Sequence, residues 1–368
     1  MDGQWLGTFS GTNSGTLIID GDNRGDHVEG RIFVFDDAPG MPGFVAYFRT
    51  PNRDPVQTMN VALEVLHPFT FDVVPRHQLP NAFPDLTLPQ QATATLTLQR
   101  RQLRIAWSTS IGTNGIALLP RSAADKPSDY RADSKIRTWD KFKQFAVGLE
   151  PGRFIFRGQP QPFRLRTAFH RTKRKDLVRF INEDIPVLHR MLTPRMRHLF
   201  HLNDPLQNGA FWNLIQHHGY PTPLLDWTQS PFVAAYFAFR PERRLSDGSA
   251  SKIRIAMFDR KQWQEDFSQL QRVHFTRPHF SILQAYAIEN ERALPQQALS
   301  SVTNVDDIET YIRSREDEND KRYLRVFDLP YEGRDHVLRE LRLMGITAGS
   351  LFPGFDGTCE ELRMQYFQ

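Results

Sequence analysis

Cysteine is almost absent from this sequence, because Cys359 is the one cysteine among 368 residues. An intrachain disulfide is therefore impossible, which is typical of proteins from a reducing compartment, and we expect a cytoplasmic location. Two glutamates follow Cys359 directly. Their negative charges disfavour the thiolate that a cysteine nucleophile requires, so Cys359 is not a candidate catalytic residue.

Long apolar runs and several common motifs are also missing. No stretch of about 18 apolar residues occurs, so the sequence predicts no membrane span. The opening residues MDGQWLGTF have neither the basic region nor the apolar segment of a signal peptide. Without an HExxH motif or a cysteine pair, we expect no zinc site. The early glycines are not followed by the Lys-Ser/Thr of a phosphate-binding loop.

Neither sign of charge is in large excess, and the formal net charge is +4. Acidic residues outnumber basic ones in residues 1–125, and the positive excess lies in the remainder. One basic run contains Arg164, Arg166, His170, Arg171, Lys173, Arg174 and Lys175. Such a run can bind nucleic acid or form a solvated basic surface, and both interpretations stay open.

A chain of this length usually forms two domains, and the patterns divide it in two. Residues 1–120 alternate between apolar and polar side chains in short runs separated by Gly, Asn, Asp and Pro. Residues 91–99 and 103–107 give the clearest β-hairpin pattern. We expect an antiparallel β-sandwich or barrel of unknown role here.

Residues 121–137 are polar, and this composition predicts a linker. From residue 138 onwards the patterns indicate a mixed domain that extends to residue 368. Helical spacing begins at Trp139, and helices are expected at 211–218, 232–239 and 337–344. Strands are expected at 153–156 and 253–258. The predicted fold class of the chain is therefore α+β.

Three separated segments carry residue types suited to chemistry. In the first, an apolar run ends in Phe156-Arg157-Gly158-Gln159. An arginine at the end of a buried strand is either paired in a structural ion pair or faces a cleft, where its planar donors suit a phosphate. Gly158 would allow a ligand to approach the backbone.

The second segment, residues 216–238, contains two prolines, then Asp226, Trp227, Thr228 and Ser230, and then a new helix. Thr228 or Ser230 is a natural N-cap, and the helix N-terminus offers free N–H groups to a phosphate. The alternative is plain capping with a packed tryptophan. His217 and His218 could contribute acid–base chemistry or simply interact with a helix dipole.

The third segment, residues 290–300, contains Arg292 and the pair Gln296-Gln297. In this order the three segments resemble the FRG domain family, named after its Phe-Arg-Gly triplet. The family's second block is similar to residues 216–237 and its third block to residues 292–300, while LFPGFDG at 351–357 matches its tail. His218, Pro223, Ala298 and Leu299 depart from the usual residues, which puts substrate preference in doubt.

The FRG pattern is similar in turn to that of ADP-ribosyltransferases, and this resemblance implies an NAD-using enzyme. Arg157 would anchor the NAD pyrophosphate, Thr228 would line the nicotinamide-ribose pocket, and Gln297, or its neighbour Gln296, would polarise the ribose hydroxyl. The residues implied around the NAD are Phe156, Arg157, Gly158, Gln159, His217, Asp226, Trp227, Ser230, Tyr236 and Gln296. No metal is implied.

The implied reaction transfers ADP-ribose to a protein or nucleic-acid acceptor, or hydrolyses NAD. A glutamine is neutral, so Asp226 or Glu291 would have to supply the charge that stabilises a cationic transition state. The family resemblance also implies a role in a bacterial toxin or anti-phage system. The competing hypothesis is a binding module that recognises a nucleotide or nucleic acid without turning it over. A protein-interaction role for the N-terminal part is compatible with both.

Overall fold

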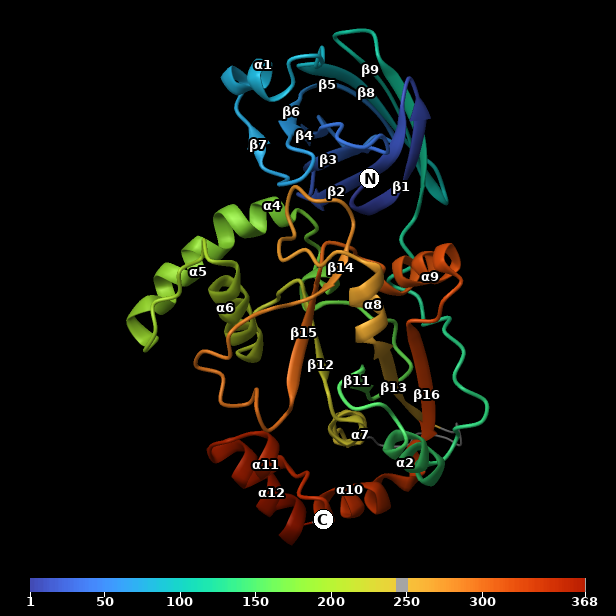
Figure 1. Ribbon diagram of the computed structural model, residues 1–368, viewed down its shortest axis with the longest axis vertical. Helices are drawn as coiled ribbons and strands as arrows, with labels where there is room; N and C mark the ends of the chain where they lie inside the picture. Colours follow the sequence, from blue (N-terminus) through green and yellow to red (C-terminus); the bar gives the residue numbers. More distant parts are fainter. Residues whose placement is uncertain (243–250, 368) are drawn as a thin grey trace.

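Two antiparallel sheets and a set of helices make up the computed structural model, which describes residues 1–242 and 251–367 (Figure 1). The first sheet belongs to the N-terminal third of the chain, and the second sheet lies below it in this view with helices around it. The fold is therefore mixed α+β, as predicted.

The first sheet has ten strands in one continuous antiparallel order, β5-β8-β9-β10-β1-β2-β3-β4-β6-β7. Its strands are β1 (Gly3–Gly11), β2 (Ser14–Asn23), β3 (Val28–Asp36), β4 (Gly43–Arg49), β5 (Val56–Ala62), β6 (Glu64–Leu66), β7 (Val73–Val74), β8 (Gln91–Leu98), β9 (Gln102–Thr109) and β10 (Asn114–Pro120). The edge strand β5 also contacts β4. The sheet therefore curls around its own core instead of forming two stacked layers, which favours the barrel over the sandwich.

Alternation along the strands explains the curled sheet. In β8 the side chains of Ala92, Ala94 and Leu96 are buried inside, whereas the threonines between them face outward. The predicted hairpin is confirmed as β8 and β9, with Leu98 opposite Leu103. A face that buries every second residue stabilises a sheet through its packed interior.

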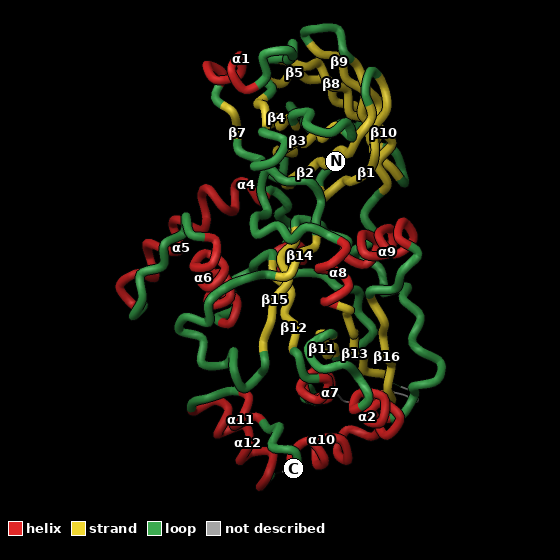
Figure 2. The backbone as a smooth tube through the Cα atoms, in the orientation of Figure 1, coloured by secondary structure: helices red, strands yellow, loops and turns green. Residues whose placement is uncertain are grey.

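The second sheet has the order β14-β15-β12-β11-β13-β16, and all its pairs are antiparallel. Its strands are β11 (Phe154–Gln159), β12 (Leu224–Thr228), β13 (Lys252–Asp259), β14 (Phe280–Ile282), β15 (Ala298–Thr303) and β16 (Leu324–Pro330). The helices, shown in red in Figure 2, are α1 (Leu79–Ala82), α2 (Trp139–Val147), α3 (Ala168–Arg171), α4 (Leu177–Arg179), α5 (Ile185–Leu192), α6 (Pro205–His217), α7 (Pro231–Phe239), α8 (Arg260–Asp266), α9 (Ile308–Asn319), α10 (Arg334–Leu343), α11 (Ala348–Leu351) and α12 (Phe355–Tyr366).

The expected elements of the second half are confirmed, with shifted boundaries. The helix expected at 211–218 begins earlier, because Asp204 caps α6 and Pro205 occupies its first turn. The helix expected at 232–239 is α7, and its N-cap is Ser230. The strands expected at 153–156 and 253–258 are β11 and β13.

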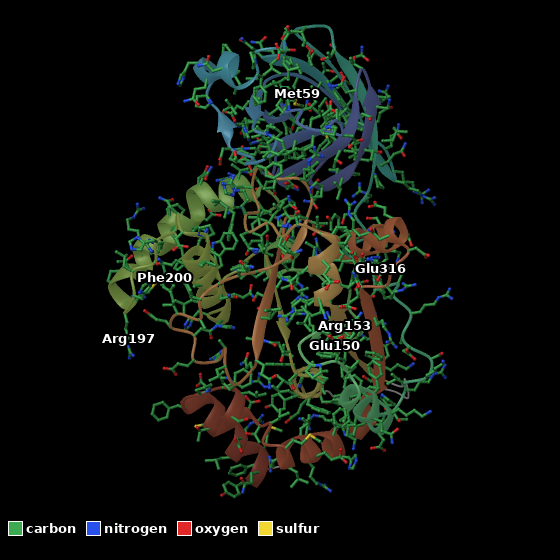
Figure 3. The ribbon with its side chains drawn as sticks, viewed as in Figure 1. Met59, Glu150, Arg153, Arg197, Phe200 and Glu316 are labelled. Atoms are coloured by element: carbon green, nitrogen blue, oxygen red, sulfur yellow. The ribbon has the colours of Figure 1, made fainter. Side chains whose placement is uncertain are left out.

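Residues 121–137, expected to be a linker, form no helix or strand but are held firmly against the second half. The Tyr130 hydroxyl donates to Glu316 Oε2 at 3.1 Å. Glu316, labelled in Figure 3, also accepts from the backbone N–H groups of Tyr323 at 2.7 Å and Leu324 at 2.8 Å. Burial, together with the Glu316 carboxylate, raises the pKa of Tyr130. This segment is consequently an ordered part of the second half and not a flexible spacer.

Most of the charged side chains in the basic run at 164–175 form ion pairs within the chain. Its arginines have these acidic partners: Arg164 pairs with Asp129 and Asp307, Arg166 with Asp125 and Asp306, and Arg174 with Asp22 and Asp184. The Lys175 ammonium is buried and donates to the His170 carbonyl at 2.6 Å. Asp22 belongs to β2, and it also accepts from the backbone N–H of Lys175. The run therefore fastens the two halves together, and only Arg171 and Lys173 of it are exposed.

Buried His279 gives the protein a titratable group whose effect on stability can be measured. Its Nε2 lies 2.8 Å from the Arg272 carbonyl, which can only accept, so Nε2 carries a proton. Burial lowers the pKa of His279 to about 4. The unfolded chain has the ordinary value of about 6.5. The stability contributed by the neutral ring is thus complete above pH 6.5 and is lost as the pH falls from 6.5 towards 4.

We expect this loss to reach about 2 kcal/mol at pH 5. The measurement is denaturant unfolding of the wild type and of His279→Gln at pH 7.5 and pH 5.0. Because glutamine does not titrate, the stability advantage of the wild type should shrink by about that amount at the lower pH. Parallel stability curves for the two proteins would contradict the burial of a neutral ring.

Within residues 1–242 and 251–367, no helix combines the length and the apolar character needed to cross a bilayer.

Candidate functional site

The three segments singled out in the sequence meet around one cleft of about 390 Å³. Arg157 comes from β11, residues 226–228 come from β12, and residues 290–300 come from the loop before β15 and from its first half. The residues predicted for the site that line this cleft are Phe156, Arg157, Gly158, His217, Asp226, Trp227, Thr228 and Gln296.

The cleft exists because two central strands separate. Strands β11 and β12 are paired only where Phe156 lies opposite Thr228. Beyond that point β12 follows β15, and β11 follows β13, and the two pairs of strands diverge in Figure 1. The Asp226 carbonyl would lack a strand partner here, and Arg157 Nη1 donates to it at 2.7 Å. One guanidinium thus closes the end of the ladder, and the same residue lines the cleft.

Arg157 has no carboxylate partner among the described residues. It is half-buried, and its Nε has no hydrogen-bond partner in the described chain. Burial lowers the pKa of Arg157, and the nearby Asp226 carboxylate opposes this shift. Arg153, one residue before the same strand and labelled in Figure 3, instead forms an ion pair with Asp259 at 2.7 Å. Of these two arginines, only Arg157 keeps donors for a ligand.

Gly158 is required for the packing of α7 on β11. A Cβ at this position would lie 1.8 Å from the Ala234 carbonyl oxygen and 2.8 Å from the Ala238 nitrogen. Both atoms belong to the backbone of α7, which can therefore lie directly on β11. The Gly158 backbone also lines the cleft, but it is the packing of α7 that excludes a side chain at this position.

Thr228 and Ser230 have different tasks. The Thr228 hydroxyl lines the cleft, donates to the Gln296 carbonyl at 2.7 Å and accepts from the Ser230 N–H at 3.1 Å. Ser230 is the N-cap of α7, accepts from the Val233 N–H at 3.2 Å and does not line the cleft. The α7 N-terminus is thus capped by its own side chain and is not the phosphate site that the sequence suggested. The Trp227 indole packs in the core, where its Nε1 donates to Ser301 Oγ at 2.9 Å.

Asp226 is the one acidic residue among those that line the cleft, and it is exposed. Its carboxylate accepts from the Gln216 amide, and Ser300 Oγ lies 3.4 Å away. His217 lines the cleft beside it. Burial lowers the pKa of His217, while the Asp226 charge opposes this shift. The site therefore contains a carboxylate next to an imidazole that is neutral at pH 7.

The two glutamines of the third segment are placed differently. Gln296 lines the cleft and is buried, and its Nε2 donates to the Leu351 carbonyl at 2.9 Å. Gln297 is exposed, has a positive φ of 46° and is absent from the lining. Its carbonyl accepts from the Gln229 N–H at 3.0 Å. The structure thus places Gln296, and not Gln297, at the cleft.

Two further predicted residues point elsewhere. The Tyr236 side chain is buried and lines a separate cavity beside α10 and α11. Burial raises the pKa of Tyr236 to about 12. Gln159 is buried at the end of β11 and is not part of the lining. Neither side chain belongs to the lining of the cleft, because Tyr236 faces the other cavity from α7 and Gln159 is buried in the interior.

Sequence reasoning missed part of the lining. Phe352, from the tail motif, holds the Arg292 guanidinium 5.5 Å from its ring centroid. Arg292 has no ion pair among the described residues. Asn213 accepts from Ser300 Oγ at 2.8 Å, and Tyr286 is an exposed aromatic at the rim. The motifs already contained Arg292 and Phe352, but no pattern indicated Asn213 or Tyr286.

Residues 152–247 match the sequence model of the FRG domain. The chain contains an FRG domain. The match covers β11, α6, β12 and α7, which provide two sides of the cleft. The third side, residues 290–300, lies outside the matched part of the FRG domain. No curated protein and no solved structure matches the chain.

Charge and size limit what the FRG cleft can do. Arg157 and Arg292 offer guanidinium groups without carboxylate partners in the described chain, which suits a phosphate-bearing ligand. No group of three or more His, Cys, Asp or Glu side chains in residues 1–242 and 251–367 is arranged to hold a metal ion. The volume lies within the usual range for small-molecule sites.

Proposed function

We propose that the FRG cleft binds NAD and catalyses transfer of its ADP-ribose to a macromolecular acceptor or to water. The observation that carries this proposal is the half-buried Arg157 guanidinium, which has no carboxylate partner among the described residues and lines a cleft that also contains the Asp226 carboxylate. A dinucleotide needs both features, because its pyrophosphate is anionic and its reacting ribose becomes cationic.

The anionic part of NAD would bind between the two arginines. Arg157 is fixed by its bond to the Asp226 carbonyl, and Arg292 is held over the Phe352 ring. Both guanidinium groups are thereby oriented before a ligand arrives, which lowers the entropic cost of binding. Phe352 and Tyr286 provide aromatic surface for the bases.

The reaction needs a bond cleavage and a proton transfer. The glycosidic C–N bond breaks with its electron pair leaving on neutral nicotinamide, and the ribosyl centre becomes positively charged. Asp226 would stabilise that charge, and it is preferred to Glu291 here because Asp226 lines the cleft and Glu291 does not. The acceptor oxygen or nitrogen then bonds to the ribose carbon, and His217, neutral at pH 7, would take its proton.

The test is incubation of the pure full-length protein with NAD labelled in the adenine ring, alone and with cell extract. We expect release of nicotinamide, together with label on protein, on nucleic acid or in free ADP-ribose. Thermal stabilisation by NAD without any product would instead identify a non-catalytic nucleotide-binding module. That second function is favoured by Gln296, whose amide nitrogen is already bound to Leu351. Absence of both stabilisation and product would reject NAD as the ligand.

A further inference from the structure

A second cavity lies inside the curled N-terminal sheet, far from the chemistry of the FRG cleft. It has a volume of about 110 Å³. Its walls are mostly apolar and include Phe9, Ile32, Ala46, Ala94 and Trp107. Strands from both halves of the sheet contribute, so the cavity lies within the sheet and not on its outer face.

The cavity is left by small residues at inward-facing positions. Ala94 lies opposite Met59 on one neighbouring strand and opposite Trp107 on the other. An alanine between two large side chains leaves space that a leucine would fill. Trp107 is half-buried and packs edge-to-face on Phe9 with ring centroids 5.3 Å apart. These two rings form an aromatic wall.

Gly115 holds this wall in place. A Cβ on Gly115 would lie 2.2 Å from the Trp107 ring. The indole can therefore lie flat across β10, at the side of the cavity where the chain turns from β9 into β10. The position of Trp107 is thus determined by the backbone beneath it.

The rim beside these turns is polar, and its side chains are paired with one another, although the Asp36 carboxylate can accept a further hydrogen bond. Asn13 donates to the Asp36 carboxylate, and the hydroxyls of Thr109 and Thr113 are 2.6 Å apart. No buried side-chain polar atom of the lining lacks a partner in the described chain. Water inside would find few hydrogen bonds, so an apolar group is the better occupant.

We propose that this cavity binds a small molecule with one aromatic ring and a polar substituent, of the phenol class. The volume of about 110 Å³ is smaller than that of an apolar cavity of about 150 Å³ that accommodates benzene, so at most one ring can be buried and its substituents must remain at the rim. A helix or strand of a partner protein is too large to enter. The aromatic wall favours a ring over an alkyl chain, because rings stack offset or edge-to-face, and the rim offers hydrogen bonds to a hydroxyl group.

The test uses p-cresol as the probe and the full-length protein. Its dissociation constant is measured by calorimetry and its contacts by saturation-transfer NMR. We expect saturable binding to the wild type and at least about tenfold weaker binding to Ala94→Leu, whose side chain fills the cavity. The matched control is Ala106→Leu, on the same pair of strands but facing outward. It should bind p-cresol like the wild type.

A second filling variant, Ala46→Val from β4, tests the same wall should Ala94→Leu not fold. It is also expected to weaken p-cresol binding. Equal binding by the wild type and both filling variants would overturn the proposal, as would binding of hexanoate in preference to p-cresol. Failure of p-cresol to bind the wild type at millimolar concentration would overturn it too. NAD turnover is not part of this test, so its outcome is independent of the function proposed for the FRG cleft.

Discussion

Replacement of Arg157 by alanine should abolish NAD turnover while the protein remains folded. A charge-assisted hydrogen bond to phosphate contributes roughly 1.5–3 kcal/mol, so NAD binding should weaken by about 10- to 150-fold. The fold tolerates the change, because the one hydrogen bond that Arg157 makes within the described residues is to the Asp226 carbonyl, at a cleft that solvent can reach. The measurements are nicotinamide release, NAD affinity by calorimetry and the thermal unfolding midpoint.

The neighbouring Arg153 provides the control. It precedes the same strand but is paired with Asp259 and does not line the cleft. Arg153→Ala should therefore leave NAD affinity unchanged and at most lower stability, because partly exposed ion pairs contribute little. Full activity of Arg157→Ala, or equal loss of activity in both variants, would show that Arg157 does not anchor the ligand.

Replacement of Asp226 by asparagine should slow nicotinamide release by about 10²- to 10³-fold, the usual effect of removing one electrostatic contact to a charged transition state. Asparagine has the same shape and can still accept from Gln216, so NAD affinity should change by only a small factor. This separation of turnover from binding is the expected signature of a residue that acts on the transition state.

Glu291→Gln is the matched control for this change, since it also removes one negative charge from the neighbourhood. Glu291 is exposed and is not part of the lining, so its loss should leave turnover and affinity unaltered. Should Asp226→Asn keep the wild-type rate, the charge assigned to Asp226 plays no part in the reaction. A large loss of affinity in that variant would instead make Asp226 a binding residue.

Local patterns predicted the elements of the fold well. Ala92, Ala94 and Leu96 alternate with threonines, and this period of two is sufficient to predict a strand with one buried face. Ser230 followed by proline predicts where α7 begins. The predicted start of α6 was less accurate. The prediction began the helix at the buried Phe211, whereas Asp204 caps the helix and Pro205 begins it.

The partners of charged and small residues could not be predicted in the same way. The basic run at 164–175 suggested a nucleic-acid surface or a solvated face, yet Asp22 on β2 and Asp306 after β15 pair with it. Those carboxylates are more than a hundred residues away in the chain. Gly158 is a similar case. The helix α7 can pack on it only because glycine has no Cβ, and this helix lies some 70 residues later in the chain.

The sequence by itself determined the two kinds of secondary structure, the order of the three motifs and the presence of an FRG domain, since these depend on side-chain periodicity and on residues close together in the chain. Only the tertiary structure decided that Arg157 keeps free donors, that Asp226 and Gln296 line the cleft, and that Tyr236, Ser230 and Gln297 do not. The physical reason is that burial and pairing are set by which distant segments meet, and here by the point at which β11 and β12 separate.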